Sequence, residues 1–171
     1  IQARVAQCHI KDNSRRAVPR QGGAAAFPGL IPAKPYCADY YEEGLRIRGK
    51  KEALKRRHVQ FNGPNSFDWI NFDVDRDEAY RAAEDANLPA PTIISINPPN
   101  GHVLLSYLLK TPVHRVESSN RRPIEWLADI QRGFTRRLDA DRSFHGVVMK
   151  NPMHCDWRTT WPTIRPYTLE D

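Results

Sequence analysis

Cysteine and long apolar runs are both scarce in this sequence of 171 residues. Its 3 cysteines, Cys8, Cys37 and Cys155, are odd in number and widely spaced. That arrangement fits neither a disulfide framework nor a Cys-x-x-Cys zinc half-site. No apolar run approaches the roughly 20 residues that cross a bilayer, and residues 1–16 carry no secretory pattern. We therefore expect a cytoplasmic protein with no membrane partner.

The charge balance favours one sign. Lys and Arg number 26 against 20 Asp and Glu, which gives a formal net charge of +6. Because each phosphate that a cationic side chain neutralises releases a condensed counterion, this excess favours a polyanionic partner. Hydrophobic residues make up 40% of the chain, which argues against disorder by composition. The length suits one domain over residues 1–171.

Apolar periodicity and turn residues predict an α+β domain, with helices packed on a small sheet. Residues 1–35 are expected to be an irregular N-terminal segment, because Val18 to Pro35 is rich in Pro, Gly and Ala. The clearest amphipathic helix lies over Pro123 to Leu138. The other expected elements are helical stretches from Ala38 to Gly44 and from Lys50 to His58, a strand over Trp69 to Asp75, a helix over Asp77 to Asn87, and strands over Thr92 to Ile96, His102 to Leu109 and Gly146 to Lys150.

Two carboxylates share one face of the strand expected over Trp69 to Asp75. Side chains alternate along a strand, so Asp73 and Asp75 point one way and the intervening apolar residues point the other. Their Cα atoms are expected to lie roughly 6–7 Å apart, which lets both acids bind one hard cation or a pair of them. Mg²⁺ accepts one or two carboxylates and keeps its other positions for water and phosphate oxygens. The alternative is a surface strand with two solvated acids.

His102 follows a turn that contains glycine, Asn97 to Gly101, and begins the next strand. Beside a pair of carboxylates, an imidazole can contact phosphates or act as an acid. A lone histidine is more often structural, so the interest of His102 depends on its neighbours.

The loop Asn151 to Trp157 leaves the last strand with a mixture of Asn, His and Trp. Loops of this composition on a rigid scaffold are typical of ligand contacts. His145, His154 and Cys155 lack the paired spacing of a zinc site.

The stretch before the acidic strand is dense in positive charge. A helix there would present at least one strongly positive face, as a site that handles a triphosphate or a template backbone requires. The alternative is a solvated helix face. The residues concerned are Arg46, Arg48, Lys51, Lys55, Arg56 and Arg57.

Several short motifs follow one another in a fixed order. They are Tyr41 to Arg48, Ala53 to Asn62, Asn71 to Asp75, Asn97 to His102, Ala140-Asp141 and Lys150 to Pro152. In this order they resemble the replicase family of bacterial plasmid replication initiators, which look like members of the archaeo-eukaryotic primase superfamily. The resemblance covers roughly Tyr36 to Trp157.

The resemblance implies roles for particular residues. Asp73 and Asp75 match the superfamily's Asp-x-Asp motif, which binds divalent metal. His102 matches the histidine that contacts the phosphates of the incoming nucleotide. A third acid is expected before the last strand, and Asp141 is our choice, with Asp139 and Asp129 as alternatives.

The resemblance also implies a fold and an activity. The expected fold is a primase-polymerase core with a sheet like that of an RNA-recognition motif, flanked by helices and joined to a smaller α/β unit. Such initiators recognise a plasmid origin and lay down a short primer for the host DNA polymerase. Their origin-binding part normally lies C-terminal to the catalytic domain and is expected to be absent from this chain.

The resulting hypothesis is a domain for DNA-templated primer synthesis from nucleoside triphosphates. Mg²⁺ or Mn²⁺ would be held by Asp73, Asp75 and Asp141. The triphosphate would be bound by His102, Arg56, Arg57, Lys150 and Asn151, and the template by Arg46, Arg48, Lys51 and Lys55. Two rivals are a non-catalytic module that only grips origin DNA, and a sugar-nucleotide transferase that uses Asp-x-Asp for its metal and diphosphate.

Overall fold

The computed structural model describes residues 21–171, so predictions for residues 1–20 lie outside the described part. The strands form two four-stranded antiparallel sheets, in the orders β2-β1-β3-β7 and β4-β6-β5-β8. The elements in chain order are α1 (Gln21–Ala26), η1 (Phe27–Leu30), β1 (Tyr36–Ala38), η2 (Tyr41–Glu43), β2 (Arg46–Ile47), α2 (Lys50–Ala53), β3 (His58–Val59), β4 (Ser66–Val74), η3 (Ala79–Arg81), α3 (Ala82–Asp85), β5 (Ile93–Ile96), β6 (Val103–His114), α4 (Arg121–Leu138), β7 (Met149–Lys150) and β8 (Arg158–Thr160), where η marks a 3-10 turn.

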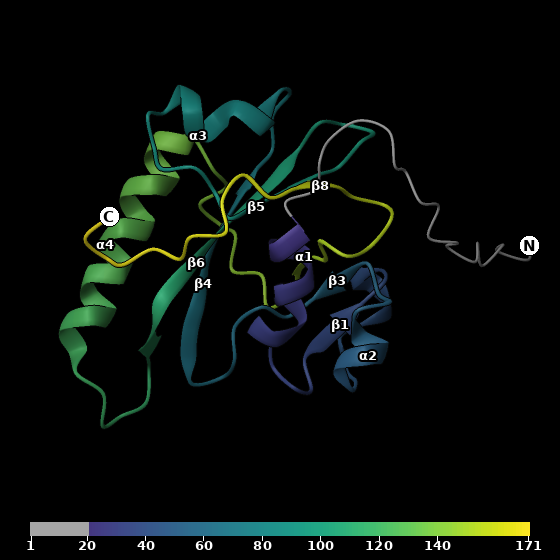
Figure 1. The fold of residues 1–171 in the computed structure, drawn as a ribbon, viewed down its shortest axis with the longest axis horizontal. Helices are drawn as coiled ribbons and strands as arrows, with labels where there is room; N and C mark the ends of the chain where they lie inside the picture. Colours follow the sequence, from purple (N-terminus) through teal and green to yellow (C-terminus); the bar gives the residue numbers. More distant parts are fainter. Residues whose placement is uncertain (1–20) are drawn as a thin grey trace, which may run out of the picture.

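The larger sheet, β4-β6-β5-β8, uses the alternation predicted for β4. Ile70, Phe72 and Val74 are buried in one core cluster with Leu127 of α4. Phe72 stacks on Phe134 of the same helix, with ring centroids 5.5 Å apart. Figure 1 shows α4 lying along one face of this sheet. No helix among residues 21–171 is both long and apolar enough to span a membrane.

The smaller sheet, β2-β1-β3-β7, packs on the other face of β4. Trp69 points to the face of β4 opposite Ile70, Phe72 and Val74. It is 1% exposed and belongs to a second core cluster with Phe27, Val59 and Met149. The rings of Phe27 and Trp69 meet edge to face at 6.0 Å. By alternation, Asp73 shares the face of Trp69. That carboxylate therefore lies in the layer between the two sheets.

The segment expected to be irregular is ordered where the structure describes it. Gln21–Ala26 forms α1 and Phe27–Leu30 forms η1, so the prediction of a loop over Val18 to Pro35 is wrong for these residues. Phe27 is 0% exposed, and burying its ring fixes the chain that carries it. Gly23 adds to this packing, because a Cβ at that position would lie 2.8 Å from the ring of Trp161.

The helical stretches expected from Ala38 to Gly44 and from Lys50 to His58 are wrong over most of their length. Helix α2 covers only Lys50–Ala53. His58 instead pairs with Ala38 of β1 on one side and with Lys150 of β7 on the other. Local composition favours a helix there, but pairing with a strand far along the chain overrides that preference.

The remaining elements match the prediction with shifted ends. Strand β4 begins at Ser66 and β6 continues to His114, so their pairing is longer than expected. The helix predicted from residue 77 to 87 is divided into η3 and α3. It is also shortened at both ends, where Glu78 and Asn87 adopt positive φ angles of 56° and 49°. Strand β8 was not predicted.

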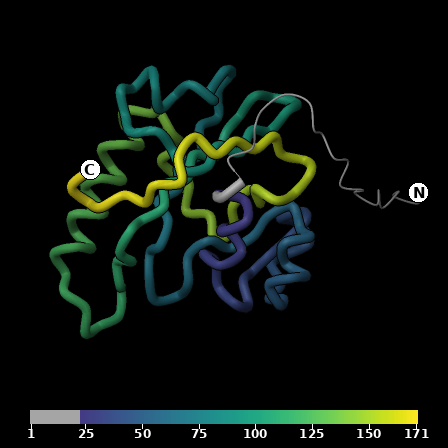
Figure 2. The backbone as a smooth tube through the Cα atoms, in the orientation of Figure 1, coloured from purple at the N-terminus to yellow at the C-terminus, as the bar shows by residue number. Residues whose placement is uncertain are grey.

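The C-terminal run returns to the larger sheet. Tyr167 donates its N–H to Leu108 O at 2.8 Å and accepts the Lys110 N–H at 2.8 Å. Its hydroxyl donates to Ala90 O at 2.7 Å. In Figure 2 this run, drawn in yellow, crosses the molecule toward the side where α4 lies.

Candidate active site

Asp73 lies near the end of β4, between the two sheets. Its Oδ1 accepts a hydrogen bond from Lys150 Nζ at 2.7 Å, and the two side chains are 22% and 14% exposed. Lys150 comes from β7 of the smaller sheet. This charge-assisted bond joins the two sheets at the acidic strand, where partial burial makes it stronger than a surface ion pair.

Asp75 follows β4 and faces His102, with 3.0 Å between Oδ1 of the carboxylate and Nδ1 of the ring. A tight turn sets the position of His102. The Asn97 N–H donates to His102 O at 2.8 Å, the Gly101 N–H donates to Asn97 O at 2.9 Å, and the His102 N–H donates to Asn100 Oδ1 at 3.1 Å. Gly101 has a φ of 71°, a conformation that favours glycine. The predicted hairpin link therefore brings His102 to the acidic pair.

Asp141 reaches the same place from the other side of β4. Its backbone N–H donates to Asp73 O at 2.9 Å, and β4 is the edge strand of its sheet. Its carboxylate accepts from the Ser143 N–H at 2.8 Å and from Ser143 Oγ at 2.8 Å. The alternatives lie on the helix: Asp139 is the C-cap of α4, and Asp129 pairs with Arg132. The backbone contact therefore favours Asp141 as the third acid.

The charges of these acids act on one another. Burial raises the pKa of Asp73, the ammonium group of Lys150 opposes that rise, and the negative charges of Asp75 and Asp141 add to it. Hydrogen bonds from Ser143 lower the pKa of Asp141. A cation held among the acids would relieve this repulsion, and carboxylate oxygens are the donors that hard divalent cations prefer.

Each acid is engaged by a neighbour: Asp73 by Lys150, Asp75 by His102, and Asp141 by Ser143. The three fit a hard cation by donor type. Sharing one ion would require the carboxylates to turn from these partners.

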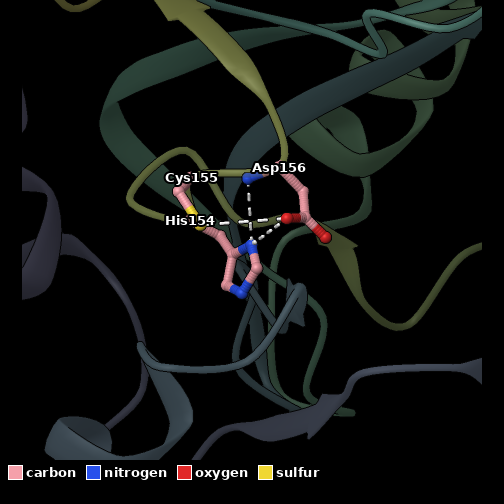
Figure 3. A group of neighbouring side chains, drawn as sticks. All are labelled: His154, Cys155 and Asp156. Atoms are coloured by element: carbon pink, nitrogen blue, oxygen red, sulfur yellow. Dashed lines mark hydrogen bonds and ion pairs between the residues drawn. The ribbon is translucent and has the colours of Figure 1, made fainter. Parts of the chain in front are cut away.

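Within residues 21–171, only one group of three His, Cys, Asp or Glu residues has its potential metal-ligand atoms within 4.8 Å of one another. The group is His154, Cys155 and Asp156 (Figure 3). The Asp156 N–H donates to His154 Nδ1 at 3.2 Å, and Oδ2 of Asp156 pairs with Arg57 Nε at 2.8 Å. Because the donors come from consecutive residues and the acid already has a cationic partner, we assign this loop a structural role.

Arg57 is held by its own neighbours. Its guanidinium lies over the rings of Tyr40 and Trp157, 4.9 Å and 5.0 Å from their centroids. Its carbonyl accepts the indole N–H of Trp157 at 2.8 Å and the Asn151 N–H at 2.8 Å. These contacts tie the loop after β7 to the turn before β3.

Asn151 is 0% exposed. Its Nδ2 donates to Leu54 O at 2.8 Å and to Arg56 O at 2.7 Å, and its Oδ1 accepts from the Met153 N–H at 3.1 Å. The side chain has no donor left for a nucleotide. The role predicted for Asn151 as a nucleotide contact is therefore replaced by one in positioning the loop after Lys150.

The basic residues before the acidic strand do not share one helix face. Arg46 lies on β2, an edge strand of the smaller sheet, and Lys51 lies on α2. Lys55 pairs with Glu52 at 2.8 Å. Arg56 pairs with Asp39 at 2.8 Å. A cleft of about 120 Å³ gathers Arg46, Arg48 and Arg56 around Asp39 and Glu43.

Tyr41 and His58 border the site. Both lie within motifs that carry the family resemblance, but neither was predicted to have a role in the site. Their rings lie 4.7 Å apart. Burial and the charge of Asp73 both raise the pKa of Tyr41, so its phenol lies within electrostatic reach of that carboxylate. Tyr41 is nevertheless 56% exposed, which leaves an aromatic surface beside the acids.

Comparisons with known proteins agree on the kind of fold. A family model described as the Replicase family matches residues 30–171. A solved structure, the archaeo-eukaryotic primase domain of the cyanophage S-2L primase-polymerase, is similar in fold with a TM-score of 0.53 at 11% sequence identity. That similarity covers 81% of this chain and 86% of the phage chain. No protein of curated function matches the chain.

Proposed function

The chain belongs to the Replicase family, and from that premise we propose that it is a nucleotidyltransferase that synthesises short primers on a DNA template. The observation that supports the proposal is that Asp73 and Asp75 share one face at the end of β4, with the Asp141 N–H bonded to Asp73 O. Lys150 and His102 contact the carboxylates of Asp73 and Asp75. A site that joins nucleotides needs both signs of charge: acids for metal, and cations for phosphate.

The acids would hold Mg²⁺ or Mn²⁺. When bound, such ions neutralise the triphosphate and favour the ionised form of an attacking hydroxyl. In the reaction, the 3′-oxygen forms a bond to the α-phosphorus, the bond to the β-phosphate oxygen breaks, pyrophosphate leaves and the hydroxyl proton passes to solvent.

The cationic residues would bind the phosphates. Lys150, whose ammonium group bonds Asp73 in this structure, would donate a hydrogen bond to a phosphate oxygen of the nucleotide. His102 has its Nδ1 oriented by Asp75, which leaves Nε2 to face the nucleotide. Asn151 and Arg57 contribute by fixing the loop that follows Lys150.

The proposal extends to the biological setting. The primer would be laid down at a plasmid origin in the cytoplasm and extended by a host DNA polymerase. Arg46, Arg48, Lys51 and Lys55 would add general attraction for the DNA backbone, while Arg56 would act mainly through its bond to Asp39.

The test measures incorporation of labelled ribonucleotides on a single-stranded template with Mn²⁺. Asp73→Ala and Asp75→Ala are each expected to lower primer yield by on the order of 100-fold, the usual cost of removing one electrostatic contributor to the transition state. Asp77→Ala is the matched control, because this acid is exposed beyond the strand, and it should leave the yield near wild type. Unchanged yield in the Asp73 and Asp75 variants would sink the assignment.

The same assay separates the candidates for the third acid. Asp141→Asn should lower the yield strongly, whereas Asp139→Asn should not. Asp139 has a φ of 50°, and asparagine tolerates that left-handed conformation, so the control keeps the helix end intact. If Asp139→Asn lowered the yield and Asp141→Asn did not, Asp139 at the C-cap of α4 would be assigned as the third metal ligand instead.

A non-catalytic module that only binds DNA remains a second candidate function, since the net charge of +6 serves it equally well. It predicts salt-sensitive DNA binding by wild type and by Asp73→Ala alike, with no nucleotide incorporation by either.

A further inference from the structure

A groove runs along the open edge of β4, away from β6. Two clefts, of about 490 Å³ and 370 Å³, adjoin there and share Asn71, Gln131, Phe144 and His145 among their lining residues. One wall is α4, and the other is the segment that leads from Asp141 to β7. We call this feature the edge groove.

The edge groove is positively charged. Arg132, Arg136 and Arg142 line its larger cleft and Arg115 lines its smaller one. Among the described residues, Arg132 pairs with Asp129, whereas Arg136 and Arg142 are exposed and have no ion pair. Free guanidinium groups on a cleft wall are suited to bidentate binding of phosphate.

The groove also offers contacts for bases. Oδ1 of Asn71 is buried and has no hydrogen-bond partner, and Asn71 lines both clefts. A turn of this amide toward the groove would present the unpaired acceptor to a base. Phe144 and the exposed ring of His145 line both clefts as well. Flat rings beside a cationic wall form the usual surface for unpaired bases, which stack on aromatic side chains.

The groove is continuous with the acids. Asp141 lines the larger cleft, and its N–H is bonded to Asp73 O. His102 directly precedes β6, which pairs with β4 along its other edge, so this residue approaches the acids from the side of β4 away from the edge groove. A second substrate, bound in the edge groove, would meet the nucleotide at Asp73.

We propose that the edge groove binds the single-stranded template and guides it to Asp73. This rests on the proposed function, because a template is needed only if the site joins nucleotides. Arg136 and Arg142 bind successive phosphates, and Asn71, Phe144 and His145 contact the bases. Stacking and an unpaired amide require bases freed from a duplex.

The experiment measures binding of a fluorescent single-stranded oligodeoxynucleotide of mixed sequence, in EDTA and without nucleotide. Arg136→Ala/Arg142→Ala is expected to weaken binding by about tenfold. It should also make the slope of log K against log[salt] shallower by about 1.4, as loss of two single-strand phosphate contacts implies. The control is Arg121→Ala/Arg122→Ala, which removes the same charge from the other end of α4, outside both clefts. It should change affinity less than twofold.

A duplex of the same sequence should compete at least about tenfold less well than the single strand, because its bases are already stacked. If the two double variants weakened single-strand binding equally, or if duplex competed as well as the single strand, the proposal that the edge groove binds the template would be contradicted. Loss of Mn²⁺-nucleotide binding with retained single-strand binding in Arg136→Ala/Arg142→Ala would contradict it too, since the groove would then hold the triphosphate.

The failures of the two proposals are distinguishable. Asp73→Ala should bind the single strand as wild type does in EDTA, whatever its effect on synthesis. If wild type makes no primer but the groove variant loses single-strand binding, the groove stands and the enzymatic proposal fails. If wild type makes primers and Arg136→Ala/Arg142→Ala binds the single strand normally, the enzymatic proposal stands and the groove proposal fails.

Discussion

At the level of single residues, His58 is the histidine that the fold holds most firmly in its neutral form. Burial and the nearby charge of Arg57 lower its pKa from 6.5 to about 4, and its Nδ1 has no hydrogen-bond partner. Between those two pH values the unfolded chain binds more protons than the folded one, so the free energy of unfolding rises with pH. Stability from neutral His58 is complete above pH 6.5 and lost as the pH falls toward 4.

His58→Phe should remove this dependence, because Phe keeps the ring between Tyr41 and Trp157 and does not titrate. Relative to wild type, the variant should gain on the order of 3 kcal/mol between pH 7 and pH 4. Urea unfolding at several pH values measures the difference between the two proteins, which cancels the other titrating groups. Parallel stability curves would contradict the assignment.

The acids show what single residues reveal from sequence alone. Alternation along β4 was enough to place Asp73 on the face opposite Ile70 and Phe72, because the period of a strand depends on local geometry. The bond between Asp73 and Lys150 was beyond prediction. It spans 77 positions in sequence and depends on how two sheets pack.

At the level of elements, the segment from Asp141 to β7 owes its path to Gly146. A Cβ at that position would lie 2.9 Å from the ring of Phe144 and 3.2 Å from Val148 O. Gly146→Ala should therefore force Phe144 from its place, lower stability by about 1–2 kcal/mol and weaken single-strand binding, since Phe144 lines the edge groove. Thermal unfolding and the oligonucleotide assay measure the two effects.

Gly133 provides the matched control. It lies within α4, and nothing lies within 4 Å of the Cβ that alanine would add. Gly133→Ala should raise stability by about 0.5–1 kcal/mol, because alanine is the better helix former, and should leave DNA binding unchanged. Destabilisation by both substitutions would show that the contact at Phe144 is not what distinguishes them.

Elements with strong local signals were predictable and elements made by distant pairing were not. Helix α4 was predicted to within its first turn, because its apolar stripe is a local signal. The prediction began at Pro123, whereas the N-cap Asn120, whose side chain accepts from the Arg122 N–H, starts the helix at Arg121. Strand β3 was not predicted, and its first residue, His58, was assigned to the end of a helix. The strand, His58–Val59, is only two residues long and exists because β1 and β7 flank it. The basic residues of that stretch were consequently assigned to one helix face that does not form.

For the whole molecule, the sheets share a core as well as a site. The second core cluster takes Trp69, Ile93 and Leu104 from the larger sheet and Val59 and Met149 from the smaller one. Such shared burial makes separate unfolding of either sheet costly, because each would expose its half of the cluster. The acidic strand β4 and strand β7, which carries Lys150, are thus held in place relative to each other by apolar packing.

Phe27 tests this link, because it belongs to neither sheet. Its ring meets those of Phe61 and Trp69 edge to face, at 5.0 Å and 6.0 Å. Phe27→Ala should destabilise the protein by about 3–5 kcal/mol, with tryptophan fluorescence and far-ultraviolet circular dichroism still unfolding together in urea. Two separated transitions would mean that the sheets fold independently. In that case packing would not explain the Asp73–Lys150 contact, and the ion pair itself would have to hold the sheets together.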